Sequence, residues 1–386
     1  MPSGFAHVAR TLDEVERLRP LWDSSEVTGP DADLDLFSAV VASSPDVLRP
    51  HVVAIERPGA SPALAVARLE EGPMDLKVGY RTVARPTLRT LVVVYGGVAG
   101  AEDGVDQRAL LSELRRPLRE GEADLLLLAK LHTDSTFYEL AREIAPWPCR
   151  DHLPVVLPRT DVAVPDTLDA FLGARSRNTR DNVKRYGKRL ERAHGDELEV
   201  RSYREPQDLD EALAAMEGVA AKTYQRALGV GFRDEPRQRG ILERGAGKGL
   251  FRGWVLRVAG TPVAFWHGLV SGGTFYIGSP GYDPDYGNLR VGQYLQMRMM
   301  EDLCADPAVQ RLDYGFGDAQ YKRSFGDRTW SEADVMIFAP RTRALAVNAA
   351  RTGIAAATRA AKRVLGDERV GALKRRARRA DAGPAA

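Results

Sequence analysis

The chain has 386 residues, of which 44% are apolar and 28% charged, and its net charge is +2. These values exclude a disordered or collagen-like chain, and so small a net charge does not by itself imply a nucleic-acid partner. At about 150 residues per domain, the length predicts two or three domains. The charge is uneven, because residues 341–386 hold 12 Lys and Arg residues against three acids.

Apolar residues at helical spacing predict three helices in the first 150 residues, and apolar runs predict four strands. The helices are expected at residues 11–22, 107–119 and 135–144, and the strands at 51–55, 63–69, 91–95 and 124–128. Thr11 and Glu14 form a capping-box pattern at the start of the first helix.

The second half repeats this order of elements. Helices are expected at residues 209–224 and 291–303, and strands at 253–258, 263–269, 274–278 and 311–317. The hairpin turn at 57–62 is mirrored by the turn at 257–262, which suggests a duplication, although unrelated hairpins can look alike. The alternation favours an α/β or α+β fold with mixed sheets. The expected divisions are residues 1–150, 151–340 and a basic helical tail at 341–386.

A glycine-rich loop at residues 281–290 leads from a predicted strand into the helix that begins at Val291. A helix N-terminus has free backbone N–H groups and a partial positive charge, which suit a phosphate. Gly292 would let an anion approach the backbone, and Arg290 could add a charge-assisted hydrogen bond. An ordinary strand–loop–helix connection would give the same pattern.

Polar residues follow the strand predicted at 311–317, a common place for a site in an open sheet. Lys322 could stabilise the negative charge of a tetrahedral intermediate. Asp313 or Asp318 could accept a proton from an attacking ammonium. A solvated loop with a salt bridge is the alternative interpretation.

Two segments are strongly basic. Residues 175–192 hold eight basic residues and two acids, and Arg180, Lys184 and Lys188 share one face of a predicted helix. That face could meet the phosphates of a cofactor or of RNA. The tail, with its cluster at residues 374–379, could contact anionic lipid or RNA. A solvated helix and a helix docked on the protein body are the plainer alternatives.

The remaining chemistry-bearing residues give little signal. Cys149 and Cys304 are isolated, and the six histidines lack metal-binding spacing, so we expect no metal. We interpret His267, like Tyr276 and Tyr282, as a packed side chain rather than a catalyst. The isolated thiols, the absence of a signal-peptide pattern and the short apolar runs lead us to expect a cytoplasmic location.

Taken in order, five segments resemble the CelD-like GNAT acetyltransferase family of the acyl-CoA N-acyltransferase superfamily, which is related to the Fem-type aminoacyl-tRNA-dependent transferases. The segments are residues 176–185, Gly260–Ala264, Gly281–Pro284, Val291–Gly292 and Asp313–Lys322. The resemblance covers residues 151–325, and the first half is similar to the family's N-terminal repeat. It implies two tandem GNAT-like domains with mixed sheets flanked by helices.

The resemblance also implies an activity and a site. It implies transfer of an acyl group from acetyl-CoA or another acyl-CoA to a small-molecule or peptide amine, without a metal. The implied cofactor-binding residues are Arg290, Val291, Gly292, Gln293 and Arg180, and the implied catalytic residues are Lys322, Asp313, Tyr321 and Asp318. Because no serine or cysteine stands in a nucleophile motif, we expect a neutral amine to attack the donor directly.

One departure from the family pattern leaves the donor open. Family members usually have Ser-Pro-Gly where this chain has Arg290-Val291-Gly292. Arg290 could replace the hydroxyl group as a phosphate partner. A Fem-like transferase that uses aminoacyl-tRNA is the first alternative, favoured by the basic segments at 175–192 and 341–379. A non-catalytic binding protein built on a GNAT scaffold is the second.

Overall fold

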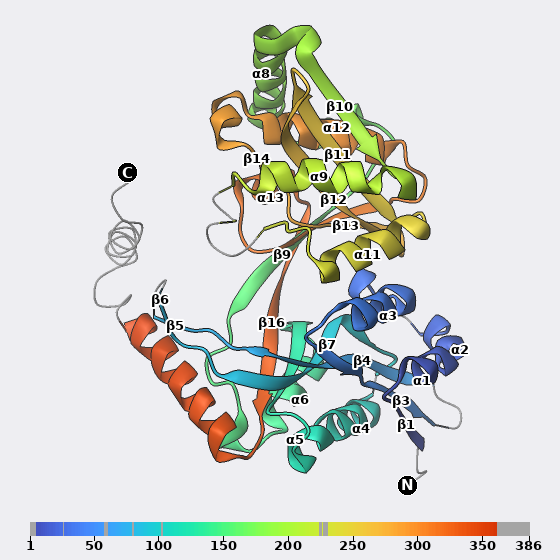
Figure 1. Ribbon diagram of the computed structural model, residues 1–386, viewed down its shortest axis with the longest axis vertical. Helices are drawn as coiled ribbons and strands as arrows, with labels where there is room; N and C mark the ends of the chain where they lie inside the picture. Colours follow the sequence, from blue (N-terminus) through green and yellow to red (C-terminus); the bar gives the residue numbers. More distant parts are fainter. Residues whose placement is uncertain are drawn as a thin grey trace. The chain divides into compact units, whose positions relative to one another are not determined.

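A computed structural model of the protein divides into two units, each built from separate segments of the chain (Figure 1). Unit 1 comprises residues 1–26, 45–156 and 333–386, and unit 2 comprises residues 27–44 and 157–332. The structure describes residues 5–25, 27–57, 61–78, 81–101, 103–223, 226 and 231–360. Each unit therefore combines segments that are far apart in the sequence, whereas the divisions predicted from the sequence, at 1–150, 151–340 and 341–386, are continuous.

The sheet of unit 1 contains a parallel pair of strands. Its order is β1 (Phe5–Ala9), β3 (Val52–Glu56), β4 (Ala63–Pro73), β7 (Thr87–Ala99) and β8 (Leu125–His132), with β2 (Val47–Pro50) beside β4. β7 and β8 are parallel, while the other pairs are antiparallel. β5 (Leu76–Val78) and β6 (Arg81–Ala84) form a separate hairpin. Parallel neighbours need a crossover connection, which α4 (Gly104–Leu114) and α5 (Arg116–Glu120) provide.

Proline divides two of the helices predicted for unit 1. The helix expected at 11–22 is α1 (Leu12–Arg17) followed by α2 (Arg19–Asp23), with Pro20 in the first turn of α2. Pro117 has the same position in α5, directly after α4. A proline inside a continuous helix would clash with the preceding turn, so each helix restarts instead. α6 (Thr136–Glu143) and the capping box at Thr11 agree with their predictions.

The first part of the basic tail is a helix that packs on unit 1. Residues 342–360 are helical, and Ala344 and Val347 are buried in the apolar core of this unit. Arg351 forms an ion pair with Asp151 at 2.7 Å. The basic cluster at 374–379 lies outside the described residues. A docked helix therefore accounts for the apolar stripe in the described part of the tail.

The sheet of unit 2 has a parallel pair at its centre. Its order is β9 (Val156–Ala163), β15 (Arg311–Phe316), β13 (Thr274–Ile277), β12 (Thr261–Ser271), β11 (Phe251–Val258) and β10 (Leu198–Tyr203), with β14 (Gly281–Tyr282) also paired to β12. β13 and β15 are parallel, and the other pairs are antiparallel. α12 (Val291–Cys304) connects the parallel strands. β16 (Arg328–Phe338) carries the chain from unit 2 into unit 1.

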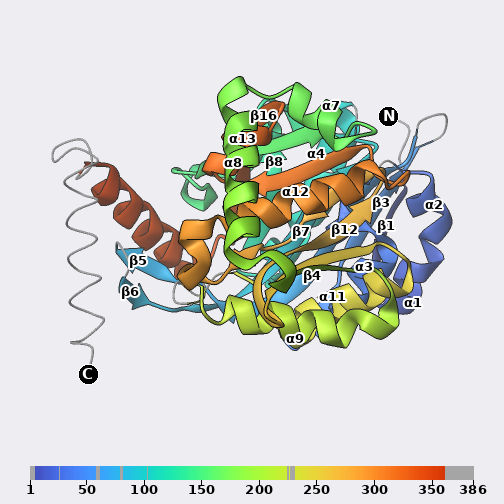
Figure 2. The ribbon, with the colours of Figure 1, turned by 90° about the horizontal axis from the view of Figure 1, so that it is seen from above.

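Helices cover both faces of this sheet (Figure 2), and each face has its own apolar core. α12, α7 (Leu168–Gly173) and α8 (Arg177–His194) pack on one face, where Trp254 and Trp266 are buried. α9 (Leu209–Ala220) and α11 (Pro236–Gly247) pack on the other face with Phe265, and α3 (Leu34–Ser43) adds Leu36 to this core. Mixed sheets flanked by helices agree with the fold class predicted from the sequence.

Candidate functional site

The parallel strands of unit 2, β13 and β15, diverge after a short stretch of pairing. Their pairing runs from Thr274 opposite Arg311 to Tyr276 opposite Asp313. The chain after β13 then turns to pair with β12, and the end of β15 pairs with β9 at Phe316. Ligands bind preferentially where neighbouring strands of an α/β sheet diverge at their carboxyl ends. The point of divergence is therefore the natural place to look for a site.

The helix after this point begins without a side-chain cap. α12 follows η5 (Pro284–Leu289), and Arg290, the residue before its first turn, has a positive φ of 59°. The amides of Gln293 and Tyr294 donate to the Arg290 carbonyl at 3.0 Å. Within the described chain, the amides of Val291 and Gly292 have no hydrogen-bond partner. An anion at the start of this helix would accept hydrogen bonds from these free N–H groups. It would also be attracted by the positive end of the helix dipole.

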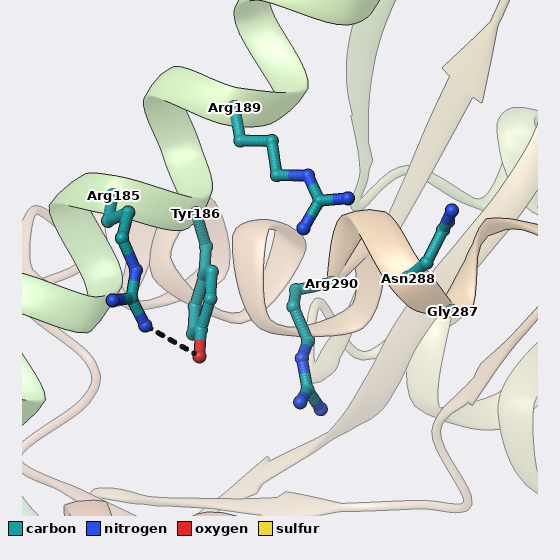
Figure 3. A pocket seen from close by; sticks show the side chains of 6 residues that line it. All are labelled: Arg185, Tyr186, Arg189, Gly287, Asn288 and Arg290. Carbon is teal, nitrogen blue, oxygen red and sulfur yellow. Dashed lines mark hydrogen bonds between the residues drawn. The ribbon is translucent and has the colours of Figure 1, made fainter.

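A cavity of about 480 Å³ lies between α8 and the start of α12 (Figure 3). Its walls come from Arg185, Tyr186 and Arg189 of α8, together with Gly287, Asn288 and Arg290. The Arg185 and Arg290 guanidinium groups lie 5.0 and 5.6 Å from the centre of the Tyr186 ring. Figure 3 shows this ring between the two guanidinium groups. The Tyr186 ring thus holds the Arg185 and Arg290 guanidinium groups near the start of α12.

The charge of this cavity is not neutralised by carboxylates. None of its six lining residues is acidic. Arg189 and Arg290 take part in no ion pair with any described residue, and Arg185 donates to the side-chain Oδ1 of Asn182 at 2.8 Å. Three guanidinium groups beside free helix amides form a setting that favours phosphate groups.

The predicted cofactor residues separate into two places. Arg290 lines the cavity, and Val291, Gly292 and Gln293 form the first turn of α12. The Arg180 side chain instead donates to the carbonyls of Gly173 and Arg175, at 3.2 and 2.8 Å, and so closes the end of α7. Sequence reasoning missed the three cavity residues of α8, although Arg185 and Arg189 have the four-residue spacing that drew attention to the neighbouring face.

Lys322 and Tyr321 lie on the short helix α13 (Gln320–Phe325), which follows β15. The buried Lys322 amine donates to the carbonyls of Gly315 and Phe316 at 2.9 and 2.6 Å. Burial lowers the pKa of this amine to about 8. The Tyr321 ring packs against Tyr314, with 5.5 Å between ring centres. Lys322 thus holds the end of β15 in its turned conformation.

The two predicted carboxylates are paired. The buried Asp313 accepts from the Arg159 guanidinium at 2.8 Å and from the Gly315 amide at 2.6 Å. Asp318 is exposed and pairs with Arg323. The structure therefore brings all four predicted catalytic residues to one end of β15, where they contact other protein groups. Their catalytic roles stay predictions.

The matching helix of unit 1 is closed by its own side chains. The Asp103 carboxylate caps α4 by accepting from the amides of Val105 and Asp106, at 2.9 and 2.8 Å. Arg57 pairs with Asp103 and Asp106 at 2.5 and 2.6 Å. The hydrogen bond from the Asp106 amide lowers the pKa of Asp103. A protein carboxylate thus occupies the anion position in unit 1, and the open helix start belongs to unit 2.

Comparisons with known proteins address the fold and the class. Residues 177–323 match the model described as an acetyltransferase (GNAT) domain. The crystal structure of FemX is 11% identical, with a TM-score of 0.57, over 87% of this chain and 97% of that one. A tandem GNAT protein from the clavulanic acid biosynthesis pathway is 10% identical, with a TM-score of 0.51, over 88% of this chain and 100% of that one. No curated protein sequence matches the chain.

These findings confirm the fold predicted from the sequence, which is that of two tandem GNAT-like domains. The match of residues 177–323 to an acetyltransferase domain supports a GNAT-type acyltransferase. The narrower CelD-like assignment stays a prediction.

Among the described residues, no helix is long and apolar enough to cross a membrane. The same residues contain no group of three or more His, Cys, Asp or Glu side chains arranged to hold a metal ion.

Proposed function

We propose that the protein transfers an acyl group from an acyl-CoA to an amine. The observation that carries this proposal is the cationic cavity at the uncapped start of α12. Acyl-CoA combines a thioester with several phosphate groups, so it needs a cationic binding region next to a reaction centre. Arg185, Arg189 and Arg290 supply the cations, and Val291 and Gly292 in the first turn of α12 supply free backbone amides.

The reaction in this proposal is direct transfer. The amine attacks the thioester carbonyl, a C–N bond forms, and the C–S bond breaks as the thiolate leaves. Lys322 and nearby backbone N–H groups stabilise the oxyanion, with Tyr321 beside them. Asp313 or Asp318 accepts the proton that the acceptor loses when its ammonium form becomes the neutral, attacking amine. The acceptor is a small-molecule or peptide amine.

Two double variants of α8 test the donor site. Replacing Arg185 and Arg189 with alanine removes two cavity cations. Replacing Lys184 and Lys188 removes the same charge from exposed positions outside the cavity. Because hydrogen bonds to charged groups contribute about 1.5–3 kcal/mol each, the first variant should bind acetyl-CoA at least about tenfold more weakly in calorimetry. The control should retain wild-type affinity. Equal affinities for the two variants would contradict the proposed site.

An aminoacyl-tRNA donor is the second candidate. Lys184, Lys188 and Arg192 are exposed on α8 and have no acidic partner among the described residues. A polyanion that follows this helix would contact them as well as the cavity. The same basic surface, and the tail at 341–379 of which the structure describes residues up to 360, would also suit an anionic membrane.

Salt dependence separates the two donors. The affinity for charged tRNA should fall steeply with salt, with a slope that grows by about 0.7–0.9 per phosphate contacted. Lys184→Ala/Lys188→Ala should then weaken binding as much as the cavity variant does. Acetyl-CoA at 100 times its Kd should stabilise the protein by about 2.7 kcal/mol if it is the donor. Stabilisation by neither ligand would favour the non-catalytic scaffold.

A further inference from the structure

A second cavity, of about 400 Å³, lies on the α11 side of the unit 2 sheet. It is lined by residues before and within α11, by one residue of β12, and by the link that follows β13. These residues are Gly231, Phe232, Arg233, Glu235, Gln238, His267, Gly278 and Ser279. It shares no lining residue with the cationic cavity at the start of α12, and none of the predicted catalytic residues lines it.

His267 gives this cavity a buried polar wall. Side chains alternate along β12, so His267 lies on the same sheet face as Phe265. Only 3% of His267 is exposed, and its ring meets Phe232 edge-on with 5.1 Å between centres. Neither ring nitrogen has a hydrogen-bond partner in the described part of the protein. A buried polar group without a partner destabilises the fold, so packing alone does not explain a histidine at this position.

The backbone opposite the ring is shaped to admit it. A Cβ atom on Gly278 would lie 2.2 Å from Cε1 and 2.5 Å from Nε2 of His267. Any residue other than glycine would therefore displace the ring. Gly278 follows β13 directly, and the last pair of the β13–β15 ladder is Tyr276 with Asp313. The imidazole consequently lies beside the point where the parallel strands diverge.

The groups around the imidazole suggest what the cavity binds. Burial lowers the pKa of His267 to about 4, so the ring is neutral at neutral pH and keeps one nitrogen as an acceptor. Arg233 and Glu235 are the charged residues of the lining. Neither has an ion-pair partner among the described residues, and the Glu235 side chain does not cap α11. One cation and one anion beside a neutral acceptor are complementary to an amino acid.

We propose that this cavity holds the acceptor, a small amine that also carries a carboxylate, and that His267 bonds its attacking nitrogen. The inference rests on the proposed acyl transfer. Arg233 pairs with the acceptor's carboxylate. As the C–N bond forms, His267 takes one proton from the nitrogen. The C–S bond breaks with its electron pair on sulfur, and the imidazolium returns the proton to the thiolate, directly or through water.

The experiment measures thiol release from acetyl-CoA with each of the twenty amino acids and with 1,5-diaminopentane, which is lysine without its carboxylate. We expect at least one amino acid to be acetylated in preference to the diamine. Acetylation of the diamine alone, or of no amino acid while acetyl-CoA binds, overturns the assignment of the acceptor class. Failure of acetyl-CoA to bind the wild-type protein would instead contradict the proposed function.

His267→Leu separates a chemical role from a packing role. Leucine removes the unpartnered nitrogens, so the melting temperature should stay the same or rise. The kcat should fall about 100-fold or more, as on loss of a general base, while the Kd for acetyl-CoA is unchanged. Arg233→Ala should mainly raise the KM for the amino acid. If His267→Leu keeps the wild-type kcat, or if it has a lower melting temperature than the wild type, the proposed role of His267 as the base is overturned.

Discussion

The Lys322 amine donates hydrogen bonds to two consecutive backbone carbonyls at the end of β15. Gly315 and Gly317 have positive φ angles of 68° and 87°, so the chain turns sharply where Lys322 holds it. This turn follows the last paired residue of the β13–β15 ladder, Asp313. A residue that fixes the strand end can influence acyl transfer through geometry, through its charge, or through both.

Lys322→Met keeps the long side chain and removes the donor. Two buried carbonyls then lose their partner, so the free energy of unfolding should fall by about 1–3 kcal/mol in urea titrations at pH 7. The folded-state pKa of about 8 lies below the ordinary value of 10.5, so the unfolded chain binds more protons between these values. The stability of the wild type relative to the variant should therefore rise from pH 8 to pH 10.5.

Lys188→Met, which removes an exposed amine on α8, is the control and should leave stability unchanged. Equal stability of Lys322→Met and the wild type would contradict the anchoring role. Turnover is the separate readout, since a wild-type rate in Lys322→Met would remove the predicted role in stabilising the oxyanion.

At the scale of elements, the start of α12 combines backbone strain with a functional side chain. Arg290 has a left-handed backbone conformation that non-glycine residues adopt at a cost. Its guanidinium group lines the cavity and stacks near Tyr186. The residue is thus favourable for binding a phosphate and unfavourable for the local fold.

Arg290→Gly and Arg290→Ala separate these two effects. Both variants lose the guanidinium group, so both should bind acetyl-CoA about tenfold or more weakly in calorimetry. Only glycine relieves the positive φ, so Arg290→Gly should be about 1 kcal/mol more stable to urea than Arg290→Ala. Equal stabilities of the two variants would show that the backbone carries no strain, and wild-type affinity in either would exclude Arg290 from the donor site.

Local patterns predicted the elements that have strong periodicity. α9, α12 and both hairpins lie close to their predicted positions because their apolar residues recur at regular spacing. α11 was missed, since its sequence is rich in arginine and glycine and only Leu242 among its large apolar residues is buried. The candidate site depended on longer-range information. Arg159 is 154 residues from Asp313, and no local pattern connects the two.

The two cavities, likewise, could not be predicted in full from local sequence patterns. The glycine-rich loop led to Arg290 because the sequence motif is contiguous. The contribution of Arg185 and Arg189 depends on how α8 packs beside η5, and the cavity at His267 depends on strand pairing. Both arrangements are tertiary, so residue spacing alone left them out.

For the molecule as a whole, the two units have a common plan and different helix starts. In each unit a helix links two parallel strands, β7 to β8 and β13 to β15. α4 of unit 1 is capped by Asp103, whereas α12 of unit 2 has no side-chain cap. An acidic cap repels a phosphate from the position that the free amides would otherwise offer. The plan is thus duplicated, while the proposed donor site is confined to unit 2.

This difference predicts a binding stoichiometry. Calorimetric titration of the full chain with acetyl-CoA should give one site per chain, because the anion position at α4 is filled by a carboxylate. Arg185→Ala/Arg189→Ala should weaken that single site. Arg57→Ala, which removes a cation beside Asp103 in unit 1, should leave its affinity and stoichiometry unchanged. Two equivalent sites, or a loss of affinity in Arg57→Ala, would mean that unit 1 also binds the donor.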